Sequence, residues 1–100
     1  MLLARNARYP FGEIDLVMLD GRTLAFVEVR RRQRTDFGGA AASVDRAKRR
    51  KLARAAQAWL AGHPRHAQAP CRFDVVAVTP GADGLACEWI PAAFTLDDIA

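Results

Sequence analysis

The chain contains few cysteines and no long apolar run, and these two features argue against several classes of protein. Its two cysteines, Cys71 and Cys87, lack CxxC spacing and histidine partners arranged for zinc. A zinc site or disulfide framework is therefore disfavoured, and we expect two small, reduced, buried residues. No stretch reaches the ~18 continuous apolar residues of a membrane helix. Because Met1 to Pro10 also lack the apolar run of a secretion signal, we expect a cytoplasmic protein.

Hydrophobic residues and arginine, by contrast, are abundant. Hydrophobic residues make up 51% of the 100 residues, which suits a single small domain spanning residues 1–100 with a modest core. The net charge is +4, and 13 of the 15 cations are arginine. Their clustering predicts a polyanionic partner, although a solvated basic face is the simpler alternative. The two clusters are Arg30, Arg31, Arg32 and Arg34, and Arg46, Lys48, Arg49, Arg50, Lys51 and Arg54.

The first third of the sequence predicts a three-stranded antiparallel meander. Strands are expected over Leu2–Tyr9, from about Glu13 to Leu19, and from about Leu24 to Arg31, because these runs are rich in β-formers and are separated by turn residues. The glycines of Phe37-Gly38-Gly39 then end the pattern, and the small residues up to Ser43 predict a loop.

The remaining sequence predicts a helix and further strands, and hence an α/β fold with a mixed central sheet flanked by helices. Asp45 is a good N-cap for an amphipathic, basic helix running to about Ala61, where Gly62 ends it. Apolar residues from Arg72 to Val78 predict a strand buried within the sheet, in which Asp74 is expected to pair locally. A short strand from about Cys87 to Ile90 and a turn through Phe94 and Leu96 complete the chain.

Acidic residues interrupt two of the predicted strands, GEIDL at Gly12–Leu16 and FVEVR at Phe26–Arg30. Alternation places Glu13 and Asp15 on one face, with Ile14 and Leu16 on the other. A two-residue Asp20-Gly21 turn would set Glu13 opposite Glu28, whereas a loop from Asp20 to Thr23 would set Asp15 opposite Glu28, the register that we favour. In both registers two carboxylates face each other, an arrangement that a divalent metal would relieve.

Two such acids followed by a cation can form a phosphodiesterase site. Asp15 and Glu28 would bind Mg²⁺ or Mn²⁺, with the carbonyl of Val29 as a further ligand, and Arg30 would steady phosphate charge. The simpler reading is that both acids are solvated or pair with nearby arginines. Glu13 is either a third ligand or, as we expect, solvated.

These residues carry a resemblance to a known family. GEIDL, FVEV followed by a cation, FGG, a basic helix opening VDRAK, and RFDVVAV resemble, in this order, the YraN-like family of small bacterial proteins. That family is predicted to belong to the PD-(D/E)xK nuclease superfamily, which is restriction-endonuclease-like and Holliday-junction-resolvase-like. The resemblance implies a restriction-endonuclease-like core, a metal-dependent nuclease site and DNA as substrate.

The resemblance also assigns roles and exposes two departures. Asp15 and Glu28 match the superfamily's metal-binding acids, and Arg30 stands where lysine is usual. Arginine stays protonated, so it cannot act as a general base. The family pattern also has a helix with an acidic residue before the first strand, whereas this chain opens on the strand. We expect that helix to be missing or replaced, leaving apolar surface that could promote a homodimer.

Two functions follow from this pattern. The first is a metal-dependent DNA endonuclease, acting on branched DNA or without structural preference; the second is a nuclease-fold module that binds nucleic acid without cleaving it. Phosphate contacts would come from basic residues after the third strand and in the first turns of the helix. These residues are Arg32, Arg46, Lys48, Arg49, Arg50 and Lys51.

Overall fold

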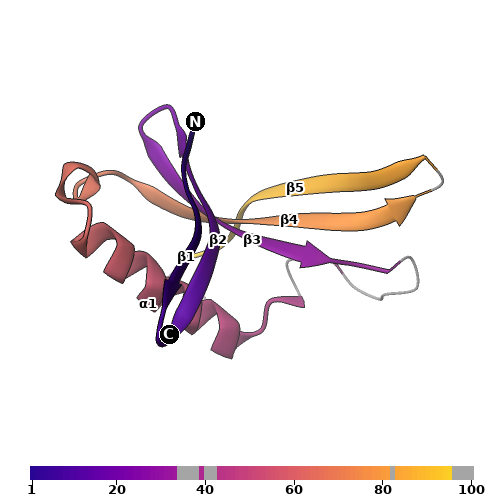
Figure 1. Ribbon diagram of the computed structural model, residues 1–100, viewed down its shortest axis with the longest axis horizontal. Helices are drawn as coiled ribbons and strands as arrows, with labels where there is room; N and C mark the ends of the chain where they lie inside the picture. The colour runs from indigo at the N-terminus through magenta and orange to yellow at the C-terminus, as the bar shows by residue number, and fades with distance from the viewer. Residues whose placement is uncertain (34–38, 40–42, 82, 96–100) are drawn as a thin grey trace.

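The computed structural model describes residues 1–33, 39, 43–81 and 83–95, which form a five-stranded mixed sheet with a long helix packed on it (Figure 1). The strands lie in sequence order. The first three pair antiparallel, β3 and β4 pair in parallel, and β5 returns antiparallel to β4. The elements are β1 (Leu2–Tyr9), β2 (Gly12–Asp20), β3 (Thr23–Arg31), α1 (Arg46–Ala61), the 3-10 helix η2 (Pro64–His66), β4 (Cys71–Gly81) and β5 (Gly84–Phe94).

The predicted α/β class, with a mixed sheet and an antiparallel meander, is confirmed. The crossover from β3 to the parallel strand β4 runs through α1, as such connections usually do. The last strand differs from the prediction, because β5 is 11 residues long and includes Phe94, where a turn was expected. Pairing with the long strand β4 extends β5 to Ile90 and resumes at Phe94, with a register shift where Pro91 lies between them. Leu96 and most of the predicted loop before Ser43 lie outside the described residues.

Helix α1 forms as its sequence predicts. The Asp45 side chain accepts a hydrogen bond from the Lys48 backbone N–H at 2.8 Å, and Gly62 provides the C-cap. The apolar stripe of the helix, which includes Leu52 and Trp59, is buried against the sheet. The Trp59 ring meets Phe26 of β3 edge to face, with ring centroids 6.0 Å apart. No helix in the described part of the chain is both long and apolar enough to span a membrane.

Strand β2 separates from β3 near the predicted acidic cluster. Their pairing runs from Asp20–Thr23 to Leu16–Val27, which is the favoured register, although the connecting turn is only Gly21-Arg22. The predicted alternation is wrong at this end of β2. Ile14 and Val17 both belong to the main core, although three residues apart, because β2 bends where its pairing with β3 stops.

Helix α1 contacts β2 closely at the start of the GEIDL segment. A Cβ atom added to Gly12 would lie 3.0 Å from the Lys51 carbonyl oxygen and 3.3 Å from the Lys51 Cβ. Real Cβ atoms essentially never come closer than this, so glycine lets the helix backbone approach the strand. The contact fixes the first half of α1 beside the acidic segment of β2.

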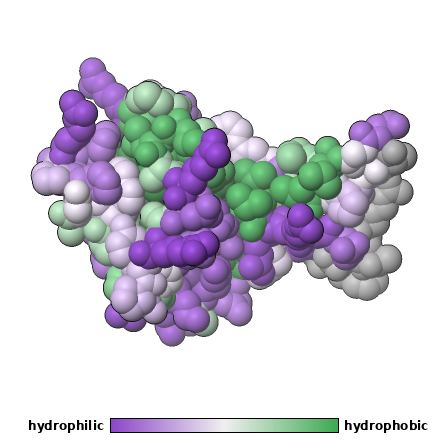
Figure 2. Space-filling view, viewed as in Figure 1, coloured by the Kyte–Doolittle hydropathy of each residue, from purple (hydrophilic) through white to green (hydrophobic). Residues whose placement is uncertain are grey.

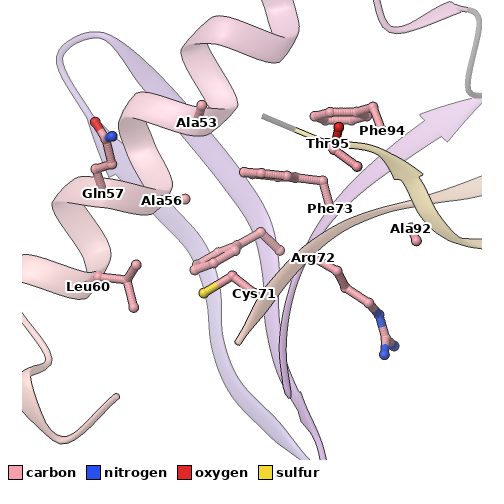
Figure 3. Close-up of a pocket in the computed structure, with 11 residues that line it drawn as sticks. Ala53, Ala56, Gln57, Leu60, Cys71, Arg72, Phe73, Ala92, Phe94 and Thr95 are labelled. Carbon is pink, nitrogen blue, oxygen red and sulfur yellow. The ribbon is translucent and has the colours of Figure 1, made fainter. Parts of the chain in front are cut away.

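Two hollows of the molecule lie away from the acidic cluster. One, of about 370 Å³, opens between α1 and the β4–β5 strands, and Figure 3 shows Phe73 and Phe94 on its wall. The centroids of these two stacked rings are 5.0 Å apart. The other, of about 310 Å³, is lined by residues of β2, β3, β4 and β5, among them Met18, Val27 and Trp89. Both are mainly apolar.

The expectation that both cysteines are buried is wrong. Cys71 and Cys87 are both exposed free thiols. Cys71 is the first residue of β4, and Cys87 lies on the outermost strand, so neither position receives a covering layer.

Candidate metal centre

Glu28 is the central residue of the acidic cluster. Alternation along β3 places it on the same face as Phe26, toward α1, and only 5% of the residue is exposed. Its Oε1 lies 3.8 Å from the Arg30 Nη1 and 3.8 Å from the Lys48 Nζ. Its Oε2 is buried without a hydrogen-bond partner among the described residues. Half of this buried carboxylate therefore has no ligand within the described part of the chain.

The electrostatic surroundings oppose ionisation of Glu28. Burial raises the pKa of this carboxyl above its ordinary value, and the charges of Asp15 and, more weakly, Glu13 raise it further. Lys48 and Arg30 pull the pKa of Glu28 the other way without cancelling the rise. Because both cations keep about a third of their side chains in water, they compensate the buried charge incompletely. A bound cation would complete that compensation.

Asp15 is held at the point where β2 leaves β3. Its Oδ2 accepts a hydrogen bond from the Val29 backbone N–H at 2.8 Å, replacing the next rung of the ladder. The N–H groups of Leu24 in β3 and of Arg32 just after it point to β4, so the N–H of the odd-numbered Val29 points to β2. The N–H and C=O of one strand residue point to the same neighbour. The Val29 carbonyl therefore faces the side of β3 where Asp15 lies, as its predicted role requires.

Arg30 is positioned by the segment that leads into α1. Its Nη2 donates to the Ser43 carbonyl at 2.8 Å, and its Nε donates to the Ser43 Oγ at 3.3 Å. The guanidinium is thus fixed beside Glu28, with a third of the side chain still exposed. It can stabilise negative charge there, but it cannot take a proton from water.

The other acids of the sheet have different roles. Glu13 is partly exposed and lies 3.4 Å from Arg8, in line with a solvated surface residue. Asp74 is fully buried but satisfied locally, as predicted, by Arg72, the Trp89 Nε1 and the Ala92 N–H. No three Asp, Glu, His or Cys side chains in residues 1–33, 39, 43–81 and 83–95 gather as a metal site. A metal here would rely on two carboxylates, a carbonyl and water.

The predicted phosphate-binding residues divide into two groups. Arg46, Arg50 and Lys51 are exposed on the first turns of α1, where no acidic residue lies in the first turn. Arg49 is partly buried; its Nε donates to the Val44 carbonyl at 2.8 Å, and its guanidinium lies 5.0 Å from the centre of the Phe94 ring. Arg32 donates to the Gly39 carbonyl at 3.3 Å. Arg49 therefore serves packing, whereas the exposed cations can meet a ligand.

Sequence reasoning missed the position of Lys48. It was assigned to phosphate binding with its neighbours, yet the structure brings its Nζ to Glu28, 20 positions earlier in the chain. The three-residue spacing between the N-cap Asp45 and Lys48 is the available signal. It places Lys48 in the first turn of α1, and because α1 packs on the sheet, a long side chain there can reach Glu28. The sequence likewise marks Ser43 only as a small loop residue.

Comparison with known proteins identifies the family of the chain. Residues 1–78 match the uncharacterised protein family UPF0102. A UPF0102 protein of Xanthomonas campestris pv. campestris (strain B100) is 58% identical over 97 residues, covering 97% of this chain and 78% of the relative. A UPF0102 protein of Stutzerimonas stutzeri (strain A1501) is 54% identical over 93 residues, covering 93% and 78%. The chain therefore belongs to the uncharacterised family UPF0102, which is the YraN-like family that its motifs resemble.

Proposed function

We propose that this protein is a Mg²⁺- or Mn²⁺-dependent DNA endonuclease with a restriction-endonuclease-like core of the PD-(D/E)xK superfamily. The order of its motifs supports this assignment, and so does the mixed sheet that carries the two acids on neighbouring strands. The bacterial cytoplasm, where DNA is accessible, is the compartment that we propose.

The observation that carries the proposal is the buried Oε2 of Glu28, which has no hydrogen-bond partner in residues 1–33, 39, 43–81 and 83–95. Leaving a buried carboxylate oxygen unsatisfied costs roughly 1–3 kcal/mol, so such groups are rare unless they have a ligand or a catalytic role. Mg²⁺ and Mn²⁺ suit the oxygen donors of Asp15, Glu28 and the Val29 carbonyl. Mg²⁺ in particular is often bound through one or two carboxylates while it keeps several waters. The donor set therefore fits the metal that the resemblance implies.

The surroundings of the acids suit a phosphodiester. The N-terminal end of α1, which carries a positive partial charge, lies beside the acidic pair, as the contact between Lys48 and Glu28 shows. Exposed Arg46, Arg50 and Lys51 can bind the flanking phosphates without reading sequence. A bound divalent metal would supply an activated water and stabilise charge on the scissile phosphate.

Four residues of the chain have separate roles in the proposed reaction. Asp15 and Glu28 hold the donor oxygens in place, because one is bonded to the backbone of β3 and the other is packed under α1. Arg30, fixed by Ser43, stabilises negative charge on the phosphate rather than moving a proton. Lys48 lies equally close to Glu28 and can orient the attacking water through the N–H donors of its ammonium group.

A second candidate function rests on Arg30. Its replacement of the superfamily's usual lysine favours a module that binds DNA without cutting it, since the residue cannot act as a base. In that case no metal produces cleavage, and affinity for DNA simply falls as salt rises.

The deciding experiment incubates the purified chain with branched, linear and single-stranded DNA in Mg²⁺ or Mn²⁺. Cleavage should require the metal and be lost in Asp15→Asn and Glu28→Met, while DNA binding stays nearly intact. Glu13→Gln changes a partly exposed acid of β2, the strand that also carries Asp15, and this variant should retain activity. Arg30→Lys should raise the rate.

Two results would argue against an endonuclease. Cleavage that persists in Glu28→Met would identify a contaminant. Binding without cleavage in wild type and Arg30→Lys, under every metal, would leave the binding module.

A further inference from the structure

The two outer strands of the sheet differ in how their free edges are protected. Along β1, Asn6 has a positive φ of 50°, and the pairing with β2 shifts register between Leu2 and Ala4. Arg5 and Arg8 add like charges to that edge. Irregular backbone and charge are the usual devices that keep an edge strand from pairing with another chain. The edge of β1 is therefore blocked.

On β5 the irregular backbone is confined to the two ends, at Gly84 with a φ of 115° and after Ile90, where Pro91, a φ of 50° at Ala92 and a register shift occur, so the edge from Leu85 to Ile90 has no such protection. This segment contains neither proline nor a cation, and no other described strand pairs with its outer side. Leu85 and Trp89 are 70% and 56% exposed, and Cys87 between them is exposed as well. Figure 2 shows hydrophobic residues in a band along the β4–β5 hairpin. The segment carries no cation of its own, and the Arg72 guanidinium that lies 5.6 Å from the centre of the Trp89 ring is ion-paired with Asp20 and Asp74.

The pairing pattern shows which backbone groups of β5 point outward. The carbonyls of Pro70 and Val78 accept bonds from β3, so even-numbered residues of β4 face β3 and odd-numbered ones face β5. The β5 partners of odd-numbered β4 residues are even-numbered, as in Ala77–Glu88. Odd-numbered residues of β5 therefore direct their N–H and C=O groups away from β4. Leu85, Cys87 and Trp89 thus combine outward backbone groups with exposed side chains.

We propose that this edge binds β5 of a second copy of the chain, antiparallel about a two-fold axis at Cys87. In that register Leu85 of one copy lies opposite Trp89 of the other, and the two Cys87 residues lie opposite each other. Glu88, the only charged residue from Gly84 to Ile90, lies opposite Ala86, so no like charges meet. Because the edge of β1 is blocked, the assembly closes as a dimer joined by one continuous sheet.

The proposed register places the two Cys87 residues opposite each other, so a disulfide between them would report formation of the dimer. Residues that exchange both backbone hydrogen bonds across antiparallel strands have Cα atoms about 5.5 Å apart, which lies within the range that disulfides span. Mild oxidation of the full chain should therefore cross-link two copies through Cys87. Cys71→Ser should still form the disulfide dimer, and Cys87→Ser, which keeps only Cys71, should stay monomeric on a non-reducing gel.

Hydrogen exchange tests the register without any substitution. The amides of Leu85, Cys87 and Trp89 should exchange more slowly as protein concentration rises, whereas those of Ala86 and Glu88, already bonded to β4, should not change. Under reducing conditions, sedimentation should show a dimer that Leu85→Lys weakens by about tenfold or more, since each change occurs twice in a symmetric pair. Leu2→Lys, on the blocked edge, is the matched control and should leave the dimer intact.

Several results would overturn the proposal. These are a monomer at every concentration, cross-linking through Cys71 alone, slowed exchange without the odd–even alternation, or assemblies that grow beyond two copies. Circular dichroism checks that each variant is folded. Cys71 is exposed, but partial desolvation raises the pKa of its thiol, so its reactivity is measured separately with a small alkylating reagent.

Discussion

Replacing Glu28 should stabilise the protein while it removes the proposed metal site. In Glu28→Met, an unbranched apolar side chain of similar length takes the place of a buried carboxylate with one unpartnered oxygen. Removing that unsatisfied group should raise the free energy of unfolding by about 1–3 kcal/mol in the absence of metal. In a domain of this size, each kcal/mol raises Tm by about 4–8 °C. Lys48 and Arg30 remain partly in water and can be solvated.

The pH dependence of this gain has a defined sign. The pKa of Glu28 is raised in the folded state by burial and by the charge of Asp15, so the wild type binds this proton more tightly when folded. Its stability is therefore highest below the ordinary glutamate pKa and falls as pH rises through the folded-state value. Glu28→Met lacks this loss. The difference in Tm between variant and wild type should grow as pH rises above about 4.5.

Calorimetry of both proteins with a chelator, between acidic and neutral pH, measures this difference. Asp74→Asn is the matched control, because Asp74 is also a buried carboxylate of the sheet, but both of its oxygens accept hydrogen bonds. That variant should lose about 3 kcal/mol, as expected when one partner of a buried charge network is removed. If Glu28→Met is instead destabilised by a similar amount, Glu28 is an ordinary structural carboxylate and the reasoning about its unpartnered oxygen fails.

Three smaller predictions concern the elements around the site. Gly12→Ala should lower stability by about 1–3 kcal/mol in urea unfolding, because its Cβ would press on the Lys51 backbone; an unchanged midpoint would mean that α1 moves freely. Asp45→Ala should cost about 1 kcal/mol by loss of the N-cap bond, measured the same way. Arg46→Ala and Arg50→Ala should each reduce the slope of log affinity for DNA against log salt by about 1, and unchanged slopes would place the phosphate elsewhere.

Local signals explain why much of the fold could be predicted. Asp45 and Gly62 delimit α1, and the turn residues around Gly21 delimit β2 and β3, so these bounds depend only on neighbouring sequence. β5 was underestimated because pairing with β4 across a tight hairpin, rather than its own composition, sustains it. The exposure of Cys87 follows from its place at the sheet edge, which no local pattern reveals.

The residues of the acidic cluster could be named from the sequence, but their contacts could not. Alternation and register indicated that Asp15 and Glu28 lie on neighbouring strands, and the influence of Asp15 on the pKa of Glu28 agrees with their proximity. The bond from Val29 to Asp15 could not be predicted, because it depends on where β2 bends away from β3. The position of Lys48 depends on the crossover that folds α1 back over the sheet.

The bond between Asp15 and the Val29 amide has a consequence for mutagenesis. One carboxylate oxygen ends the ladder between two strands, so alanine at this position would leave a main-chain donor of β3 without its acceptor and disturb the strand that carries Glu28. Lost activity in such a variant could reflect a displaced neighbour as much as a missing ligand. Asparagine keeps a hydrogen-bond acceptor at the same distance from the backbone. The Asp15→Asn variant therefore separates the structural role of Asp15, which is to accept the Val29 N–H, from its proposed role as a metal ligand.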